Sequence, residues 1–133
     1  MVKDFNNERE RILKIAKEFG DKIRKLRVEK KMGLREFAQK VNLSPTYISK
    51  MERGMDPPPS SDKVIRIAQV LDYDQDKLLA LAKKLPPDFE KAFTKSEVYS
   101  KRIPEFLRTA IEANLTDAEW KKLIEDLKNK SKK

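Results

Sequence analysis

Apolar side chains recur along this chain with the spacing of amphipathic helices. The N-terminal stripe repeats every seven residues and is widened by neighbours on the same face: Phe5, Ile12, Phe19 and Leu26, with Ile15, Ala16 and Ile23. This spacing predicts a helix over residues 5–31, of which residues 19–31 belong to the core. Gly20 weakens a helix by about 1 kcal/mol relative to alanine, so two separate helices are the alternative. The sequence leaves open whether the N-terminal part pairs with a second subunit or packs on its own domain.

A short helix and a tight turn are predicted next. Residues 34–41 form the helix, which follows Gly33 as a weak N-cap and buries Phe37, Ala38 and Val41. Asn42 and Leu43 make the turn, because asparagine tolerates the left-handed conformation that ends a helix.

The helix after this turn has clear start and stop signals. Ser44 is its N-cap, and Pro45 occupies the first helical position, where a missing N–H costs nothing. Ile48 and Met51 face the core, and Gly54 ends the helix. The outward side chains are small, polar or basic, which suits the major groove of DNA.

Two further helices are predicted after a rigid connector. Residues 55–59, MDPPP, cannot be helical at their prolines. Ser60 or Ser61 then caps a helix with a broad apolar face formed by Val64, Ile65, Ile67, Ala68 and Leu71. A turn at residues 72–74 leads to a helix over residues 75–83, which packs through Leu78, Leu79 and Leu81 or Ala82.

A proline-rich boundary at residues 85–87 separates a smaller helical unit. Residues 87–93 predict a short helix with Phe89 and Phe93 inward. Pro104 is expected to begin a helix that extends to residue 114 and buries Ile103, Phe106, Leu107, Ala110 and Ile111.

The last helix starts with a capping box formed by Thr116 and Glu119. Its apolar positions follow helical spacing: Trp120, Leu123, Ile124 and Leu127. A unit of about 45 residues buries too little surface to be comfortably stable alone. We therefore expect this hairpin to pack on a partner surface, either the first domain or the same hairpin of another subunit.

Composition favours an all-α fold and removes several classes of chemistry. Only three glycines occur, whereas hairpin-rich β folds need many positions with positive φ. The chain has no cysteine and no histidine, which excludes disulfides, zinc sites built from these residues and histidine general-base catalysis. No acidic cluster has a recognisable ligand spacing, and no phosphate-binding loop is present. We therefore expect no enzyme, no catalytic residue, no metal ligand and no cofactor.

The sequence predicts neither a membrane span nor a secretion signal. No apolar run approaches the ~18–20 residues of a transmembrane helix, and residues 1–11 lack the apolar core of a signal peptide. We expect a cytoplasmic protein with no membrane partner. The net charge is +9, and residues 21–56, with ten basic and five acidic residues, carry +5 of it. This excess favours an anionic partner, double-stranded DNA.

Residues 34–54, LREFAQKVNLSPTYISKMERG, resemble the helix-turn-helix of phage-repressor-like transcription regulators (Cro-type, the XRE family). FGDKIRKLRVEKKM resembles their first helix, and PPPSSDKVIRIAQVLDYDQDKLLALA resembles their fourth and fifth helices. The resemblance implies an all-α fold with three parts. These are an N-terminal helical extension over residues 1–18, a five-helix repressor-like DNA-binding domain over residues 19–84, and a small C-terminal helical dimerisation or interaction unit over residues 85–133.

The resemblance also implies which side chains contact DNA. The second helix of the motif lies in the major groove, with its N-terminal residues toward the base edges. The implied DNA-binding residues are Arg35, Ser44, Pro45, Thr46, Tyr47, Ser49, Lys50 and Arg53. Arg35 is assigned to a phosphate, whereas for Lys50 a guanine edge and a phosphate stay equally open. Tyr47 either stacks along the sugar–phosphate backbone or half-buries and holds the helix.

A structural ion pair and an interface are further implications. In relatives, the residue at the position of Glu52 pairs with an arginine of the first helix, and Arg27 occupies the matching position. Relatives bind as dimers on half-sites one helical turn apart, about 34 Å. We expect the homodimer or partner interface to consist of Phe106, Leu107, Trp120, Leu123, Ile124 and Leu127.

The predicted function is sequence-specific transcriptional regulation by a DNA-binding protein. The leading hypothesis is a dimeric repressor that recognises a palindromic operator through residues 44–53. The alternative is a helix-turn-helix adaptor or an antitoxin, whose C-terminal unit binds a partner protein such as an antagonist or a toxin.

Overall fold

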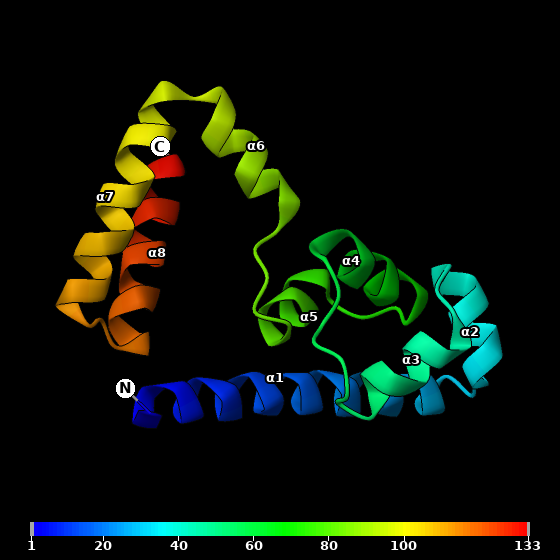
Figure 1. Cartoon of the computed structure of the whole chain (residues 1–133). Coiled ribbons are helices and arrows are strands. Elements are labelled where there is room, and N and C mark those ends of the chain that lie inside the picture. The colour runs from blue at the N-terminus through cyan, green and yellow to red at the C-terminus, as the bar shows by residue number, and fades with distance from the viewer. Residues whose placement is uncertain (1, 133) are drawn as a thin grey trace. The chain divides into compact units, whose positions relative to one another are not determined.

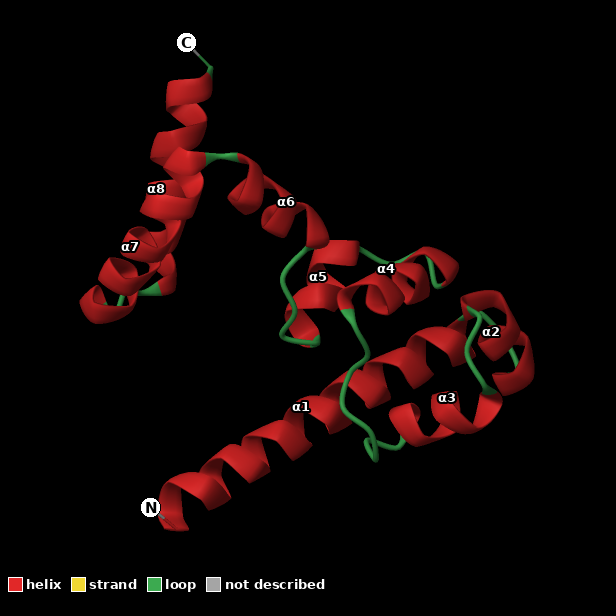
Figure 2. Ribbon diagram, turned by 45° about the horizontal axis from the view of Figure 1, so that its top comes forward, coloured by secondary structure: helices red, strands yellow, loops and turns green. Residues whose placement is uncertain are grey.

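This computed structural model describes the backbone of residues 2–132 and the side chains of residues 7–132. Within these residues, helices joined by loops are the only regular secondary structure (Figure 1 and Figure 2). In chain order they are α1 (Val2–Glu29), α2 (Leu34–Val41), α3 (Pro45–Glu52), α4 (Ser61–Val70), α5 (Gln75–Leu81), α6 (Pro87–Lys95), α7 (Glu97–Ala113) and α8 (Asp117–Ser131). The predicted all-α class is confirmed.

The helices belong to two units, Met1–Pro87 and Asp88–Lys133. Helices α1 to α5 enclose the core of the first unit, in which the largest fully buried side chains include Phe19, Ile23, Phe37, Ile48, Ile67 and Leu78. Figure 2 shows α3 crossing the C-terminal half of α1, and α5 also packs on α1. The core therefore holds α3 against a long, rigid support.

A close helix crossing explains the glycine in the middle of α1. The helix runs unbroken through Gly20, so the alternative of two separate helices is wrong. A Cβ atom on Gly20 would collide with the carbonyl oxygen of Met51 and would lie 2.8 Å from that of Glu52. The carboxyl end of α3 therefore rests directly on the backbone of α1, an approach that a residue with a side chain would block.

The packing of α1 on its own domain starts near the middle of the helix. Ala16 and Phe19 are buried, whereas Ile12 is 49% exposed and Leu13 is 57% exposed. Phe5, which belongs to the predicted stripe, lies outside the described side chains. Pairing of the earlier turns with a second subunit stays a prediction.

Local signals set the ends of α2 and α3 where the sequence predicts them. Gly33 precedes α2 in an extended conformation, and Asn42 ends the helix in the left-handed conformation with φ of 59°. Ser44 caps α3, because its hydroxyl oxygen accepts a hydrogen bond of 3.1 Å from the backbone N–H of Tyr47. Pro45 is the first residue of α3. The turn and the start of α3 are thus encoded locally.

The last helices of the first unit differ slightly from the prediction. Ser60 is the N-cap of α4 by position, while the hydroxyl of Ser61 donates to the carbonyl oxygen of Leu85 at 3.1 Å. α5 ends at Leu81 rather than at residue 83, and Lys83 follows in the left-handed conformation with φ of 59°. This conformation ends a helix, although lysine gives no sequence signal for it.

The second unit corrects two predictions. α7 begins at Glu97 rather than at Pro104, because Ser96 caps it by accepting a hydrogen bond of 3.1 Å from the N–H of Tyr99. Pro104 therefore lies inside α7, where it removes one backbone hydrogen bond. Phe89 is 54% exposed and does not face inward, since no side chain of α6 is buried.

The hairpin of α7 and α8 begins its second helix as predicted but leaves its apolar stripe uncovered. Thr116 and Glu119 form the capping box, with each side chain accepting a hydrogen bond from the other's backbone N–H. Of the α7 residues predicted to be buried, only Ala110 is buried, whereas the others are exposed: Ile103, Phe106, Leu107 and Ile111. That prediction is wrong for the chain by itself, because a two-helix hairpin has no third layer to cover it.

Candidate nucleic-acid interface

The outer face of α3 is open to solvent. Exposed side chains of the predicted contact set on α3 and at its ends are Ser44, Pro45, Thr46, Lys50 and Arg53, while Tyr47 and Ser49 are half-buried. The opposite face is buried through Ile48 and Met51. Because residues four apart share a helix face, Thr46 and Lys50 project together. The helix thus separates a core face from a polar, cationic face.

Two exposed cations of the helix-turn-helix, one on α2 and one on α3, are able to bind an anion. Arg35 is exposed in the first turn of α2, and Lys50 is exposed on α3. Within residues 7–132, neither side chain forms an ion pair. Arg53 uses its Nε to donate to the carbonyl oxygen of Ser49 at 3.2 Å, which closes the carboxyl end of α3.

A nearly buried ion pair fixes α3 to α1. Glu52 is only 6% exposed, and its carboxylate accepts hydrogen bonds from Nε of Arg27 at 2.7 Å and from Nη2 at 2.9 Å. The structure therefore brings together the two residues that the resemblance pairs. The hydrogen bond from Arg27 to Glu52 raises the pKa of the guanidinium above its ordinary value, so Arg27 stays charged.

The loop after α3 also rests on α1. Gly54 has φ of +72°, a conformation that other residues rarely adopt. A Cβ atom on Gly54 would lie 3.0 Å from Cα of Lys17. Together with Gly20, this glycine keeps both backbones in contact, so the height of α3 above α1 is set by backbone rather than by flexible side chains.

The side chain of Tyr47 on α3 faces α4. Its ring faces Nζ of Lys63, which is 5.8 Å from the ring centroid. Burial, with the charge of Asp56 as the second cause, raises the pKa of the phenol above its ordinary value. The hydroxyl group is therefore protonated at neutral pH and is a hydrogen-bond donor.

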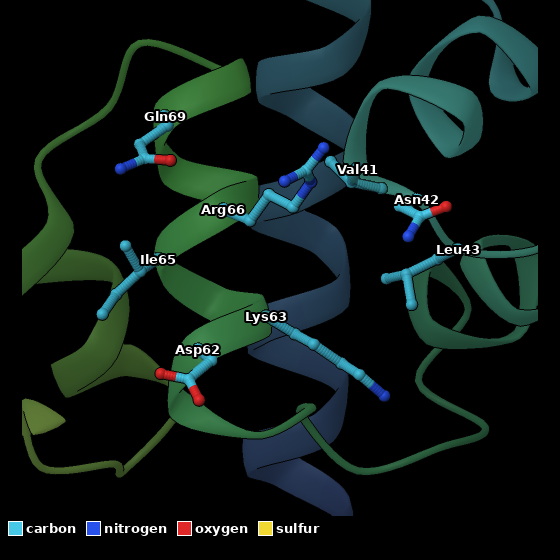
Figure 3. Close-up of a pocket in the computed structure, with 8 residues that line it drawn as sticks. All are labelled: Val41, Asn42, Leu43, Asp62, Lys63, Ile65, Arg66 and Gln69. Carbon is cyan, nitrogen blue, oxygen red and sulfur yellow. The ribbon is translucent and has the colours of Figure 1, made fainter.

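Basic residues of α4 are not among those expected from the sequence. Lys63 and Arg66 are exposed and line a shallow depression beside the turn at Asn42 and Leu43 (Figure 3). Their spacing of three residues, which places both on one helix face, could have predicted this pair from the sequence. Residues 57–93 carry six basic and six acidic groups. Because their net charge is zero, the charge count of this segment did not indicate the pair of Lys63 and Arg66.

The predicted partner interface lies in the second unit, on α7 and α8. Phe106 and Trp120 meet edge to face, with ring centroids 6.2 Å apart and planes at 73°. The remaining members are exposed to between 37% and 66%: Leu107, Leu123, Ile124 and Leu127. The hairpin thus leaves large apolar side chains of both helices exposed, as partner-binding surfaces do.

The described residues contain neither a membrane-spanning helix nor a cluster of metal ligands. None of the helices within residues 2–132 is long and apolar enough to cross a lipid bilayer. Among the side chains of residues 7–132, no three acidic groups gather where they could hold a metal ion.

The chain resembles known helix-turn-helix proteins. The helix-turn-helix family model matches residues 23–78. Among solved structures, the clp gene regulator ClgR from C. glutamicum is 29% identical, with a TM-score of 0.45, over 52% of this chain and 88% of that chain. SinR, a master regulator for biofilm formation solved in complex with DNA, is 33% identical, with a TM-score of 0.43, over 46% and 97%.

A third structure is the restriction-modification controller protein C.AhdI from Aeromonas hydrophila. It is 26% identical, with a TM-score of 0.46, over 50% of this chain and 94% of that chain. No curated protein matches the chain. The family match spans α1 to α5 and includes the paired helices α2 and α3. Through residues 23–78, the chain belongs to the XRE family of helix-turn-helix transcription regulators.

Proposed function

We propose that this DNA-binding regulator is a dimeric repressor that recognises a palindromic operator through the helix Ser44–Arg53. The observation that supports it best is the exposed outer face of α3, a helix that a nearly buried ion pair fixes to α1 within the first unit. A recognition helix must be both exposed and rigid, because base contacts require defined side-chain positions in the groove.

The outward residues match the chemistry of base edges. Pro45 and the methyl group of Thr46 offer apolar contacts to thymine methyl groups. Lys50 lies one turn later on the same face as Thr46 and is assigned to guanine O6 and N7. Ser44 at the N-terminus of α3 and Arg35 on α2 are assigned to phosphates, which position the helix without specifying sequence.

Dimerisation is the second part of the proposal. One recognition helix makes few base contacts, and two copies on a two-fold axis double them. The exposed stripe on α7 and α8 is an apolar surface that the hairpin by itself leaves uncovered. We assign the homodimer interface to this stripe. The same stripe is the feature that favours the second candidate function, in which a partner protein such as an antagonist or a toxin covers it.

Selection of bound sequences from a pool of random duplexes tests the proposal. We expect a consensus with two-fold symmetry and half-sites about one helical turn apart. A consensus without symmetry would retain base recognition but overturn the palindromic dimer. Recovery of no preferred sequence at moderate salt would overturn sequence-specific repression and leave the adaptor as the better account.

A further inference from the structure

The shallow depression beside the turn at Asn42 and Leu43 is a basic groove, to which the proposed function assigns no role. Its floor lies between α4 and the turn that joins α2 to α3, with Val41, Asn42 and Leu43 on the turn side. Figure 3 shows Lys63 and Arg66 extending from α4 toward that side, whereas Asp62 points away from it. The groove therefore presents two cations on the side of the turn and of α3.

Contact with the recognition helix ties this groove to the DNA-facing surface. Nζ of Lys63 lies 5.8 Å from the ring centroid of Tyr47, which belongs to the first turn of α3. That turn also carries the Ser44 cap, where free backbone N–H groups create a positive end. The Lys63 ammonium group and the N-terminus of α3 therefore contribute positive potential to the same place.

No described carboxylate neutralises these two cations. Within residues 7–132, neither Lys63 nor Arg66 takes part in an ion pair, although eight such pairs form elsewhere on those residues. Asp56 is the acidic group that acts on Tyr47 from the connector, and Asp62 faces away from the turn. A net positive groove next to a groove-binding helix suits the anionic strand that borders the major groove.

We infer that Lys63 and Arg66 bind the sugar–phosphate backbone of the same duplex that α3 recognises, so the DNA interface extends from the helix-turn-helix onto α4. This inference rests on the proposed function. Lysine meets a phosphate as a point charge, and arginine meets it through a planar fork of donors. Both contacts position the protein and carry no sequence information. Tyr47 keeps the lysine aligned through its ring face.

The salt dependence of duplex binding tests this inference on the full chain. Each phosphate contact contributes about 0.9 to the slope of log affinity against log salt concentration for duplex DNA. Lys63→Gln is expected to lower that slope by about 0.9, and the double change with Arg66→Gln by about 1.8. Affinity should fall equally for the selected consensus and for a scrambled duplex, and Lys63→Arg should restore the slope.

Lys22→Gln is the matched control. Lys22 also places its ammonium group over a tyrosine ring, at 5.0 Å from the centroid of Tyr73, which lies between α4 and α5. Lys22→Gln therefore removes a lysine–tyrosine contact from the same unit and leaves the proposed contact between Lys63 and the DNA backbone in place. The slope of this variant should equal that of the unchanged protein.

The outcomes separate the two proposals. An unchanged slope for Lys63→Gln, in a protein that still prefers its consensus, would overturn the α4 contact alone and point to an acidic protein partner for the groove. A lowered slope in a protein without sequence preference would support the α4 contact and overturn the proposed function. A loss of slope shared by Lys22→Gln would also overturn the α4 contact, because the effect would then be general.

Discussion

Arg27 binds Glu52 through two of its nitrogens and still uses a third donor, Nη1, on the carbonyl oxygen of Met32 at 2.9 Å. One guanidinium therefore joins α1, the end of α3 and the segment before α2. The planar fork of arginine makes this possible, and lysine would lose at least one of the three bonds. The orientation of α3 depends on this connection.

Removing the charge of Glu52 is expected to destabilise the first unit. Glu52→Gln leaves the nearly buried guanidinium of Arg27 without its counter-ion, and breaking such a pair costs about 3–5 kcal/mol. Chemical denaturation followed by circular dichroism measures the change. Glu36→Gln is the control, since Glu36 pairs with Lys40 on the surface at 3.8 Å and should cost less than about 0.5 kcal/mol. Equal effects of the two changes would contradict a structural role for the pair.

Gly20→Ala is expected to destabilise the protein, although alanine is the better helix former. The added Cβ meets the backbone of α3 at Met51 and Glu52, and such overpacking costs about 1–3 kcal/mol. Gly33→Ala is the matched control, because a Cβ there has no neighbour within 4 Å and should change stability by less than about 1 kcal/mol. Thermal melting of both variants gives the comparison. A stabilised Gly20→Ala would mean that α1 and α3 do not touch through their backbones.

Glu52 and Gly20 show which contacts the sequence was able to predict and which it was not. Glu52 and Arg27 were paired through a family resemblance, whereas the role of Gly20 was missed because its neighbour lies 31 residues away. Signals that act over a few residues, such as Asn42 at the turn and Ser44 at the cap, located α2 and α3 correctly. Distant contacts have no such local signature.

The second unit was harder to predict for a physical reason. Pro104 is a strong helix-start signal, but Ser96 provides an earlier cap, and the helix passes through the proline. Burial of its apolar stripe was also expected, yet a hairpin by itself covers little of it. The α4 side chains that line the basic groove lie seven or more residues after the helix-turn-helix of residues 34–54. Only the folded chain brings Lys63 next to Tyr47.

Lys50→Ala is expected to relax sequence preference at one base pair of each half-site. A lysine on a guanine edge contributes about 1–3 kcal/mol of discrimination against the wrong base. Arg35→Ala is the comparison, because loss of a phosphate contact should weaken all duplexes alike. Competition binding against a set of single-base variants of the consensus measures both effects. If Lys50→Ala weakened binding to all duplexes equally, Lys50 would be reassigned to a phosphate.

Charge placed on the hairpin stripe is expected to disrupt the dimer. Ile124→Glu combined with Leu127→Glu alters two side chains that are exposed in one chain, so folding of the chain should persist. Sedimentation should then give monomers, with operator affinity reduced at least about tenfold. Leu13→Glu, on the exposed stripe of α1, should leave the dimer intact. The reverse pattern would move the interface to α1.

The capping box of α8 predicts a pH effect with a defined sign. Hydrogen bonds from the backbone and side chain of Thr116 lower the pKa of Glu119. A lowered pKa contributes stability above the ordinary glutamate pKa, and this contribution is lost as the pH falls through the lowered value. A carboxyl-carbon NMR titration should show the pKa of Glu119 rising in Thr116→Ala. It should not change in Thr109→Ala, whose hydroxyl only donates to the carbonyl oxygen of Glu105. An unchanged pKa in Thr116→Ala would contradict the hydrogen bond from the Thr116 hydroxyl to Glu119.

The central claim is that the outer face of Ser44–Lys50 contacts base edges, and amide shift mapping tests it most directly. An isotope-labelled full chain is titrated with the selected consensus duplex and with a scrambled duplex of equal length. We predict that the amides of Ser44 and of residues 46–50 shift most, and that their shifts differ between the two duplexes. The same shifts with both duplexes, or changes confined to α7 and α8, would contradict the account.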